Sequence, residues 1–449
     1  MPAASPCPLS SSICWRPVPG GVTAPRGFLA AGITAGLKAS GKPDLCLVLA
    51  PEGAVCAVCA GSFTTNRVRA ACVDLCAERP AATGGGARAV LTNSGQANAC
   101  TGARGLADSL TATAALAERL GLVPEQVLIC STGVIGVPIP IDTLLAGLDP
   151  LVAALGPEGG SAAATAILTT DLVDKQIALE ADLGGQTVRI GGLAKGSGMI
   201  HPAMATLPAT LSCDAGIPTE VWGAMLGRAV ERSFNAITDD GDTSTNDTVL
   251  ALAAGPALAA EHFEALEAGL TAVARQLARA VARDGEGATC LIEVRVEGAA
   301  SEQEARAIAR TICSSSLVKT AIHGRDPNWG RIVAAAGRAG VGFDPDAVAL
   351  WLGPHQLMAA GQPLPFDRPA ASAYLGPAPP APISTPIRSG ATAWRSVWRW
   401  GEAMAAAWPG AVTSPISTCA STPITRRSQN PSHCKGFDEH MFRVSLVCH

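Results

Sequence analysis

The sequence has no run of about 18 uninterrupted apolar residues, which is roughly the length that a membrane-spanning helix needs. Its opening residues, MPAASPCPLSSSICWRPVPGG, are rich in proline and serine and lack the basic and apolar regions of a secretory signal peptide. The formal charge is only -4 and the pI is about 6.0, so no excess of positive charge favours nucleic acid or an anionic membrane as partner. These absences predict a soluble, cytoplasmic enzyme.

Disulfide and metal frameworks are also not expected. The 15 cysteines are odd in number, and most lie in apolar runs such as DLCLVLA and QVLICST. Such positions favour buried free thiols in a reducing compartment. Cys56 and Cys59 form a CxxC pair, but no second pair follows at zinc-ribbon spacing. We therefore expect no metal site.

The hydrophobic pattern predicts a mixed α/β protein. At 449 residues the chain is long enough for about two or three domains, or two large lobes, and it has no repeat of solenoid period. Strand-like apolar runs lie at 45–50, 87–93, 126–131, 186–192, 290–298 and 347–353. Helical patterns lie at 105–121, 219–234, 258–283 and 302–312.

Several turns carry more polar or glycine residues than an ordinary loop needs. They are STGVIG (131–136), directly after a strand, TTDLVDK (169–175), KGSGMIHPAMAT (195–206) and DDGDTSTNDT (239–248). Each alone is compatible with a surface loop. Together they suggest acyl chemistry, which needs a hydroxyl nucleophile, a base and amides for the oxyanion. No Ser-His-Asp nucleophile elbow supplies these groups.

Thr206 offers another solution. Attack of its hydroxyl on the carbonyl of Ala205, followed by hydrolysis, would cut the chain and leave Thr206 as a new N-terminus. The freed α-amine, with an ordinary pKa of about 7.7–8.0, could then act as base near neutral pH. Gly196 and Gly198 permit the bend that this segment requires.

Ordered motifs then point to a family. GGVTAPRGFLAAGITAGLK, NSGQANACTG, STGVIG, AKGSGMIHPAMAT, FNAITDDGDTSTND, GEGAT and LVKTAIHGRDPNWGRI follow one another along residues 15–376. In this order they resemble the ornithine acetyltransferase (glutamate N-acetyltransferase, ArgJ) family of arginine biosynthesis. The resemblance implies an αββα sandwich with two lobes, and autocleavage between Ala205 and Thr206.

Further roles follow from the same resemblance. Thr206 matches the family's nucleophile, and Thr132 and Gly133 match its oxyanion hole. The substrate-binding positions match Thr169, Lys195, Thr206 and Glu286. A lysine supplies a cation for an amino-acid carboxylate, and a glutamate supplies an anion for an ammonium group. Without the resemblance, Lys195 and Glu286 would be interpreted as solvated surface charges.

The implied reaction moves acetyl from N2-acetyl-L-ornithine to L-glutamate, with no metal or organic cofactor. Some family members also use acetyl-CoA as donor, and nothing in the sequence decides this. The implied assembly is an α2β2 heterotetramer, with an α-chain portion at 1–205 and a β-chain portion at 206–376. Two alternatives stay open: an N-terminal-threonine hydrolase or aminopeptidase, and a catalytically dead product of a frameshifted gene.

Three nearby features are interpreted as structural or left undecided. His201 precedes the nucleophile, but a free α-amine makes a histidine base unnecessary. DPNWGR (326–331) is interpreted as a turn leading into a strand, with Trp329 packed beneath it. Ala203 stands where the family usually has asparagine, which puts any hydrogen bond from that side chain in doubt.

The segment 377–449 changes character abruptly. It holds Trp394, Trp398, Trp400 and Trp408 without a readable period, and the family's usual ending is absent. Back-translation of Ala407 to Arg427 permits that ending in another reading frame. We therefore expect a frameshifted, poorly ordered tail that lacks two of the family's substrate-binding residues and a closing strand.

Overall fold

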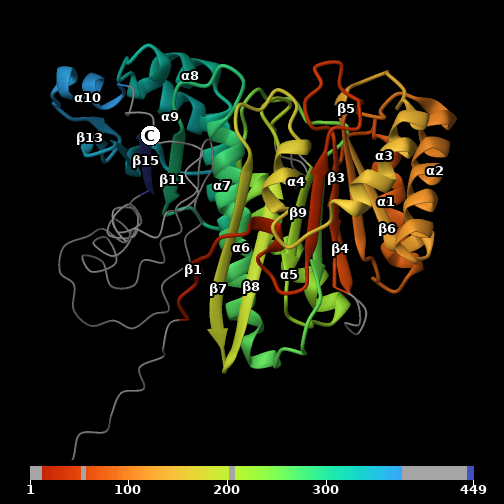
Figure 1. The fold of residues 1–449 in the computed structure, drawn as a ribbon. Helices are drawn as coiled ribbons and strands as arrows, with labels where there is room; N and C mark the ends of the chain where they lie inside the picture. Colours follow the sequence, from red (N-terminus) through yellow and green to blue (C-terminus); the bar gives the residue numbers. More distant parts are fainter. Residues whose placement is uncertain (1–12, 52–56, 202–207, 377–441, 449) are drawn as a thin grey trace, which may run out of the picture.

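The computed structural model describes residues 13–51, 57–201, 208–376 and 442–448, and Figure 1 shows how its elements are arranged. A six-stranded sheet has the order β1-β7-β8-β9-β10-β4. Its strands are β1 (Arg16–Pro17), β4 (Val58–Phe63), β7 (Lys175–Leu183), β8 (Gln186–Ala194), β9 (Pro208–Cys213) and β10 (Thr248–Ala253). Gly184 and Gly185 join β7 to β8, and both have positive φ. Such paired angles suit a tight antiparallel hairpin.

A four-stranded sheet has the order β2-β3-β5-β6. Its strands are β2 (Leu29–Ile33), β3 (Leu45–Leu49), β5 (Ala89–Gln96) and β6 (Val127–Val134). β6 runs parallel to β5 and lies at the edge. The two sheets pack face to face, because Val90 and Leu128 of this sheet share one buried cluster with Leu193 and Leu250 of the larger sheet.

Helices cover the outer face of each sheet. On the four-stranded sheet lie α1 (Ala71–Ala82), α2 (Gly102–Leu120) and α3 (Ile141–Ala153), and on the six-stranded sheet lie α5 (Thr219–Glu231) and α6 (Phe263–Arg283). A short helix, α4 (Gly160–Ala166), packs between the sheets. The expected αββα sandwich is therefore confirmed. The 3₁₀ turns are η1 (Gly21–Thr23), η2 (Pro124–Gln126), η3 (Phe234–Ala236), η4 (Ala260–His262) and η5 (Pro345–Ala347).

The second lobe is a five-stranded sheet, in the order β11-β15-β12-β13-β14, with helices packed on it. The strands are β11 (Ile292–Glu297), β12 (Val348–Leu352), β13 (His355–Ala359), β14 (Gln362–Pro363) and β15 (Phe442–Cys448). The helices are α7 (Glu302–Cys313), α8 (Ser316–His323), α9 (Trp329–Gly337) and α10 (Arg368–Tyr374). Ser301 begins α7 by accepting a hydrogen bond from the backbone N–H of Glu304.

β15 lies inside the second sheet, antiparallel to β11 and parallel to β12. Phe442, Val444 and Leu446 point into the core, and Phe442 stacks on Phe343 at a ring distance of 4.8 Å. The expectation of a poorly ordered tail is therefore wrong for residues 442–448. Residues 377–441 and 449 lie outside the described part of the chain.

Most elements expected from the sequence are present, with two corrections. β6 continues to Val134, so Thr132 and Gly133 end a strand instead of following it. Trp329 begins helix α9, so DPNWGR leads into a helix, although Trp329 does pack against the second core as expected. The division at 205/206 is not the lobe boundary, since β8 and β9 are hydrogen-bonded neighbours.

Two expectations drawn from composition can be compared with the described residues. Free thiols are buried at Cys46, Cys59, Cys72, Cys76, Cys130 and Cys213, as the apolar runs predicted. Over the described ranges, no helix combines the length and hydropathy needed to cross a membrane.

Candidate active site

A cavity of about 610 Å³ opens where the two sheets meet. Thr132 and Gly133 line it from the end of β6, and Thr169, Lys195 and Glu286 line it from three turns. The structure thus brings together all the predicted site residues that it describes. Ala203, Ala205 and Thr206 lie outside the described residues, but Pro208, two positions after Thr206, also lines the cavity.

Glycine is required at position 133. Its φ of 133° is one that side chains rarely adopt, and a Cβ there would lie 2.3 Å from the carbonyl carbon of Gly95. The adjoining strand end is held by polar contacts. Ser131 donates a hydrogen bond to Asn93 at 2.6 Å, and Asn246 donates to the carbonyl of Ser131 at 2.8 Å. The backbone at Thr132 and Gly133 is therefore fixed at the cavity wall.

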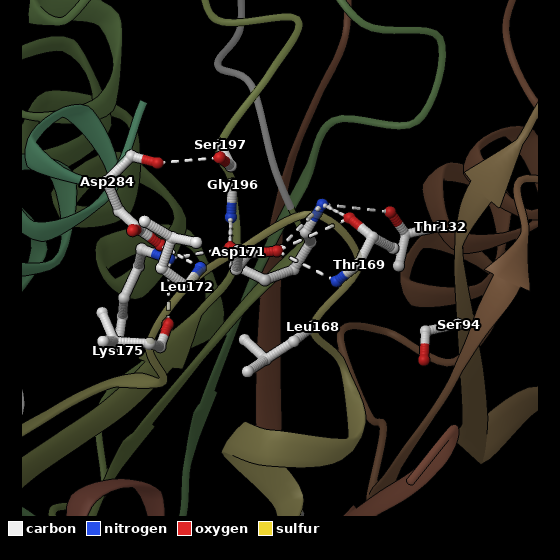
Figure 2. A network of polar contacts seen from close by, with 12 residues as sticks. Ser94, Thr132, Leu168, Thr169, Asp171, Leu172, Lys175, Gly196, Ser197 and Asp284 are labelled. Carbon is white, nitrogen blue, oxygen red and sulfur yellow. Dashed lines mark hydrogen bonds and ion pairs between the residues drawn. The ribbon is translucent and has the colours of Figure 1, made fainter. Parts of the chain in front are cut away.

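Lys195 directs its ammonium group at hydroxyls of the cavity. Its Nζ donates to Thr169 Oγ1 at 2.6 Å and to Thr132 Oγ1 at 3.5 Å, and it lies 3.6 Å from a carboxylate oxygen of Asp171 (Figure 2). Burial lowers the pKa of Lys195, with Lys175 adding to the decrease and Asp171 opposing it. The buried ammonium group therefore connects the turn that carries Thr169 with the strand end at Thr132.

Glu286 lies in the turn after α6. Its backbone N–H donates to the carbonyl of Ser197 at 2.8 Å, which couples this turn to the segment after Lys195. A Cβ at Gly198 would lie 2.8 Å from Glu286 Oε1. The glycine in KGSG thus leaves the space that the Glu286 carboxylate occupies.

Sequence reasoning missed Lys38, a second cation that lines the cavity. Its turn is organised by buried Asp44, whose carboxylate accepts backbone N–H groups from residues 35–38 at 2.6–3.1 Å. Lys38 Nζ donates to the carbonyl of Leu168 at 2.7 Å. Burial lowers the pKa of Lys38. The quoted motif GGVTAPRGFLAAGITAGLK ends on this lysine, which is a signal that could have identified it.

Asp247 was also missed, although DDGDTSTNDT was selected as a polar turn. It lines the cavity from the turn before β10, and only 1% of the residue is exposed. Neither carboxylate oxygen hydrogen-bonds to a described residue. Burial raises the pKa of Asp247 well above its ordinary value, against weaker effects of Ser244 and Lys195. Asp247 is therefore a neutral acid over a wider pH range than an exposed aspartate.

The residues interpreted as structural lie away from the lining. His201 Nδ1 is 3.0 Å from Thr238 Oγ1, and burial lowers the pKa of its ring. In the second lobe, Asn328 donates to Asp326 at 3.2 Å, and Arg331 donates to the carbonyl of Leu317 at 2.8 Å. Among the described residues, none of these side chains lines the large cavity.

Comparison with known proteins places this geometry in context. The model of the ArgJ family matches residues 29–399. The chain is 72% identical over 373 residues to the arginine biosynthesis bifunctional protein ArgJ of Prochlorococcus marinus strain MIT 9313, covering 83% of this chain and 87% of that protein. It is 70% identical over 375 residues to the protein of the same name from Parasynechococcus marenigrum, covering 84% and 90%.

Among solved structures, the chain is similar to an ornithine acetyltransferase from Mycobacterium tuberculosis that was crystallised with ornithine. The two are 44% identical with a TM-score of 0.39, and the match covers 42% of this chain and 99% of that one.

Proposed function

The chain belongs to the ArgJ family, and from this premise we propose that it is an acyltransferase of arginine biosynthesis that moves acetyl from N2-acetyl-L-ornithine to L-glutamate. One observation supports the proposal most directly. The cavity places the cation Lys195 and the anion Glu286 beside the strand end at Thr132 and Gly133. Amino-acid substrates carry both charges, and a cavity of about 610 Å³ lies within the usual range for small-molecule sites.

Each lining group has a role in substrate binding. Lys195 attracts the substrate carboxylate, and the Thr169 hydroxyl, which already accepts from Lys195, keeps that ammonium group in place. Glu286 binds an ammonium group of ornithine or glutamate. Because Glu286 is exposed whereas Lys195 is buried, the carboxylate end of the substrate enters deeper than the ammonium end.

The nucleophile arises by self-cleavage. The Thr206 hydroxyl attacks the carbonyl of Ala205, and hydrolysis of the resulting ester leaves Thr206 with a free α-amine. That amine takes the hydroxyl proton during the later attack on substrate, which explains why the site needs no histidine base. β9, which follows Thr206, remains paired with β8 before it and with β10, so both pieces stay together.

Transfer takes place in two halves. The Thr206 oxygen attacks the acetyl carbonyl of N-acetylornithine, a C–O bond forms, the amide C–N bond breaks, and the α-amine passes its proton to the departing ornithine amine. Glutamate's amine then attacks the acetyl ester, the C–O bond breaks, and a proton returns to the Thr206 oxygen. Thr132 and Gly133 stabilise the oxyanion of both tetrahedral intermediates.

The proposal includes no metal or organic cofactor, acetyl-CoA as an alternative donor for glutamate, and a cytoplasmic α2β2 heterotetramer. Acetyl-CoA use is tested by supplying it with glutamate in place of acetylornithine. The assembly is tested by measuring the mass of the native particle.

The assay that tests the function uses purified protein with N-acetylornithine and glutamate. Formation of ornithine and N-acetylglutamate in equal amounts supports transfer. Release of acetate instead supports a hydrolase with the same nucleophile. If neither product forms, the chain as written is not an active enzyme. With acetylornithine alone, acid-quenched protein should carry acetyl on Thr206, and its absence in an active preparation would exclude the covalent mechanism.

Self-cleavage has its own test. The folded chain should give two bands on a denaturing gel, and the C-terminal piece should begin Thr-Leu-Pro-Ala. Thr206→Ala should remain whole, whereas Thr210→Ala, a nearby control, should still be cut. A wild-type chain that is folded but intact would contradict the mechanism.

The tail bears on whether this chain is active. The frame change proposed between about 377 and 400 would remove two substrate-binding residues of the family, and the literal chain would then have little or no transferase activity. Nucleotide sequencing of the coding strand decides the matter. A strand whose other frame cannot encode the family ending, or full activity of the unrepaired chain, contradicts the frame change.

A further inference from the structure

A buried ammonium group lies behind the cavity, at the start of β7. The side chain of Lys175 has no exposed surface, and its Nζ donates to Asp171 at 2.7 Å, to Asp284 at 2.6 Å and to the carbonyl of Val173 at 3.1 Å. Its three donors are thus all satisfied. Among the described residues Lys175 does not line the cavity, so the proposed function leaves it without a role.

Asp171 connects Lys175 to two binding residues. One oxygen accepts from Lys175 and from the backbone N–H of Gly196 at 2.7 Å. The other accepts from the backbone N–H of Thr169 at 3.0 Å and lies 3.6 Å from Lys195 Nζ (Figure 2). The single carboxylate therefore fixes the backbone beside Thr169 and beside Lys195.

Asp284 makes the corresponding link to Glu286. The oxygen that accepts from Lys175 also accepts from the backbone N–H of Leu172 at 3.0 Å. The carbonyl of Asp284 accepts from Ser197 Oγ at 2.7 Å, and the carbonyl of Ser197 accepts from the N–H of Glu286. The turn that carries Glu286 is thereby tied to the segment after Lys195.

We infer that Lys175 is a positioning residue: it joins, through Asp171 and Asp284, the segments that carry Thr169, Lys195 and Glu286, and so sets the spacing of the groups that bind the amino-acid substrate. The inference deepens the proposed function and rests on it for the identity of the ligand. Buried ion pairs contribute little net stability compared with apolar packing. Small displacements of binding groups, in contrast, can lower rates by about 10²-fold.

Lys175 also acts on Lys195 through charge. The charged groups around Lys195 include Asp171, Asp247, Lys175 and Lys38. Burial lowers the pKa of Lys195, and the positive charge of Lys175 lowers it further. Replacement of Lys175 by an uncharged residue should therefore raise that pKa. The alkaline limb of substrate binding should move to higher pH, a change that a purely structural role would not produce.

The central variant is Lys175→Met in the full chain, assayed well below its melting temperature with N-acetylornithine. If the chain as written shows no transfer, the same variant is made in the chain with the repaired reading frame. We expect KM to rise about 10-fold to 100-fold, more than kcat falls, with the alkaline limb of the KM profile at higher pH. The matched control is Arg189→Met, which removes a 2.6 Å contact to buried Glu180 elsewhere on β7 and β8. It should lower the melting temperature and leave KM unchanged.

A second measurement does not depend on activity. Amide hydrogen exchange of Lys175→Met should be faster at Leu172, Gly196 and Glu286 together, whereas Arg189→Met should leave these amides unchanged. If neither the wild-type chain nor a chain with the repaired reading frame shows transfer but the three amides respond together, the proposed function fails and the inferred link through Lys175 stands. If exchange and KM both stay at wild-type values, the inference is wrong.

If Lys175→Met does not fold, Asp284→Asn tests the same inference. Asparagine keeps the size and one acceptor for Lys175 but removes the charge. The same amides should exchange faster and KM should rise in the same direction, by less than for Lys175→Met. An Asp284→Asn protein with unchanged exchange and unchanged KM overturns the inference.

Discussion

The two lobes bury different kinds of side chain. The sandwich lobe encloses the charges of Asp44, Asp171, Lys175 and Asp284 next to its cavity. Among the described residues beyond 290, in the second lobe, Ser315 is the only polar one that is buried as a whole, although single carboxylate oxygens of Glu293 and Glu304 are also buried. Charged groups are costly to bury unless they are paired. Paired charges are therefore buried in the first lobe, next to the proposed substrate site, whereas apolar packing stabilises the second lobe.

Deletion of residues 442–449 should produce the largest difference in stability between the two lobes. β15 contributes Phe442, Val444 and Leu446 to the second core, and each buried side chain contributes about 1.5–3 kcal/mol. Amides of β11 and β12 should lose protection from hydrogen exchange, while β5 and β8 keep theirs. Ser445→Ala, on the other face of β15, is the control and should change little. Full protection of β12 in the deletion variant would show that β15 is dispensable.

Asp171→Asn should cost the first lobe about 3–5 kcal/mol, because it leaves buried Lys195 without its paired carboxylate and leaves Lys175 with Asp284 alone. Urea unfolding at pH 7 measures this loss. Asp174→Asn changes a carboxylate of the same turn that binds only Gln176 among the described contacts, and it should lie within about 0.5 kcal/mol of wild type. Equal stability of the two variants would refute a charged network.

Acid should affect the first lobe before the second. Burial alone would raise the pKa of Asp171, but Lys195 and Lys175 outweigh it and hold the pKa well below its ordinary value. A depressed folded pKa contributes stability above the unfolded value of about 3.9, and this stability is lost as pH falls below it. Hydrogen exchange followed from pH 4 down to pH 2 should therefore show earlier loss at β7 and β8 than at β12. Simultaneous loss would contradict this order.

Asp247→Asn should have the smallest effect, less than about 1 kcal/mol at pH 5. The raised pKa means that the folded chain keeps a proton that the unfolded chain has lost, so wild-type stability falls as pH rises from about 3.9 towards the folded pKa. Asparagine does not titrate. The stability of the variant relative to wild type should therefore increase as pH rises. Urea unfolding midpoints measured at several pH values would show this. A large loss at pH 5 would indicate an ionised, partnered carboxylate.

Much of this arrangement could be predicted from the sequence, but not the contacts between distant turns. Continuous apolar runs such as 45–50 identified buried strands, since their short length favours a strand buried on both faces over a helix. The turn TTDLVDK did end on Lys175, but the link to the Glu286 turn gave no signal, because the second partner, Asp284, lies far along the chain. β15 did have a signal: Phe442, Val444 and Leu446 alternate with Arg443 and Ser445. That alternation is short and follows a tryptophan-rich segment without a readable period, so the pattern was not interpreted as a strand.

The position of β15 in the sheet has a consequence for how the chain folds during synthesis. Residues 298–441 separate β11 from the strand that pairs with it. Translation adds roughly 5–20 residues per second, so β11 waits on the order of ten seconds for its neighbour. During that time its edge and the matching edge of β12 are open to other chains. The sandwich lobe, whose strands all precede residue 254, can form first. The five-stranded sheet of the second lobe can be completed only after β15 has been synthesised.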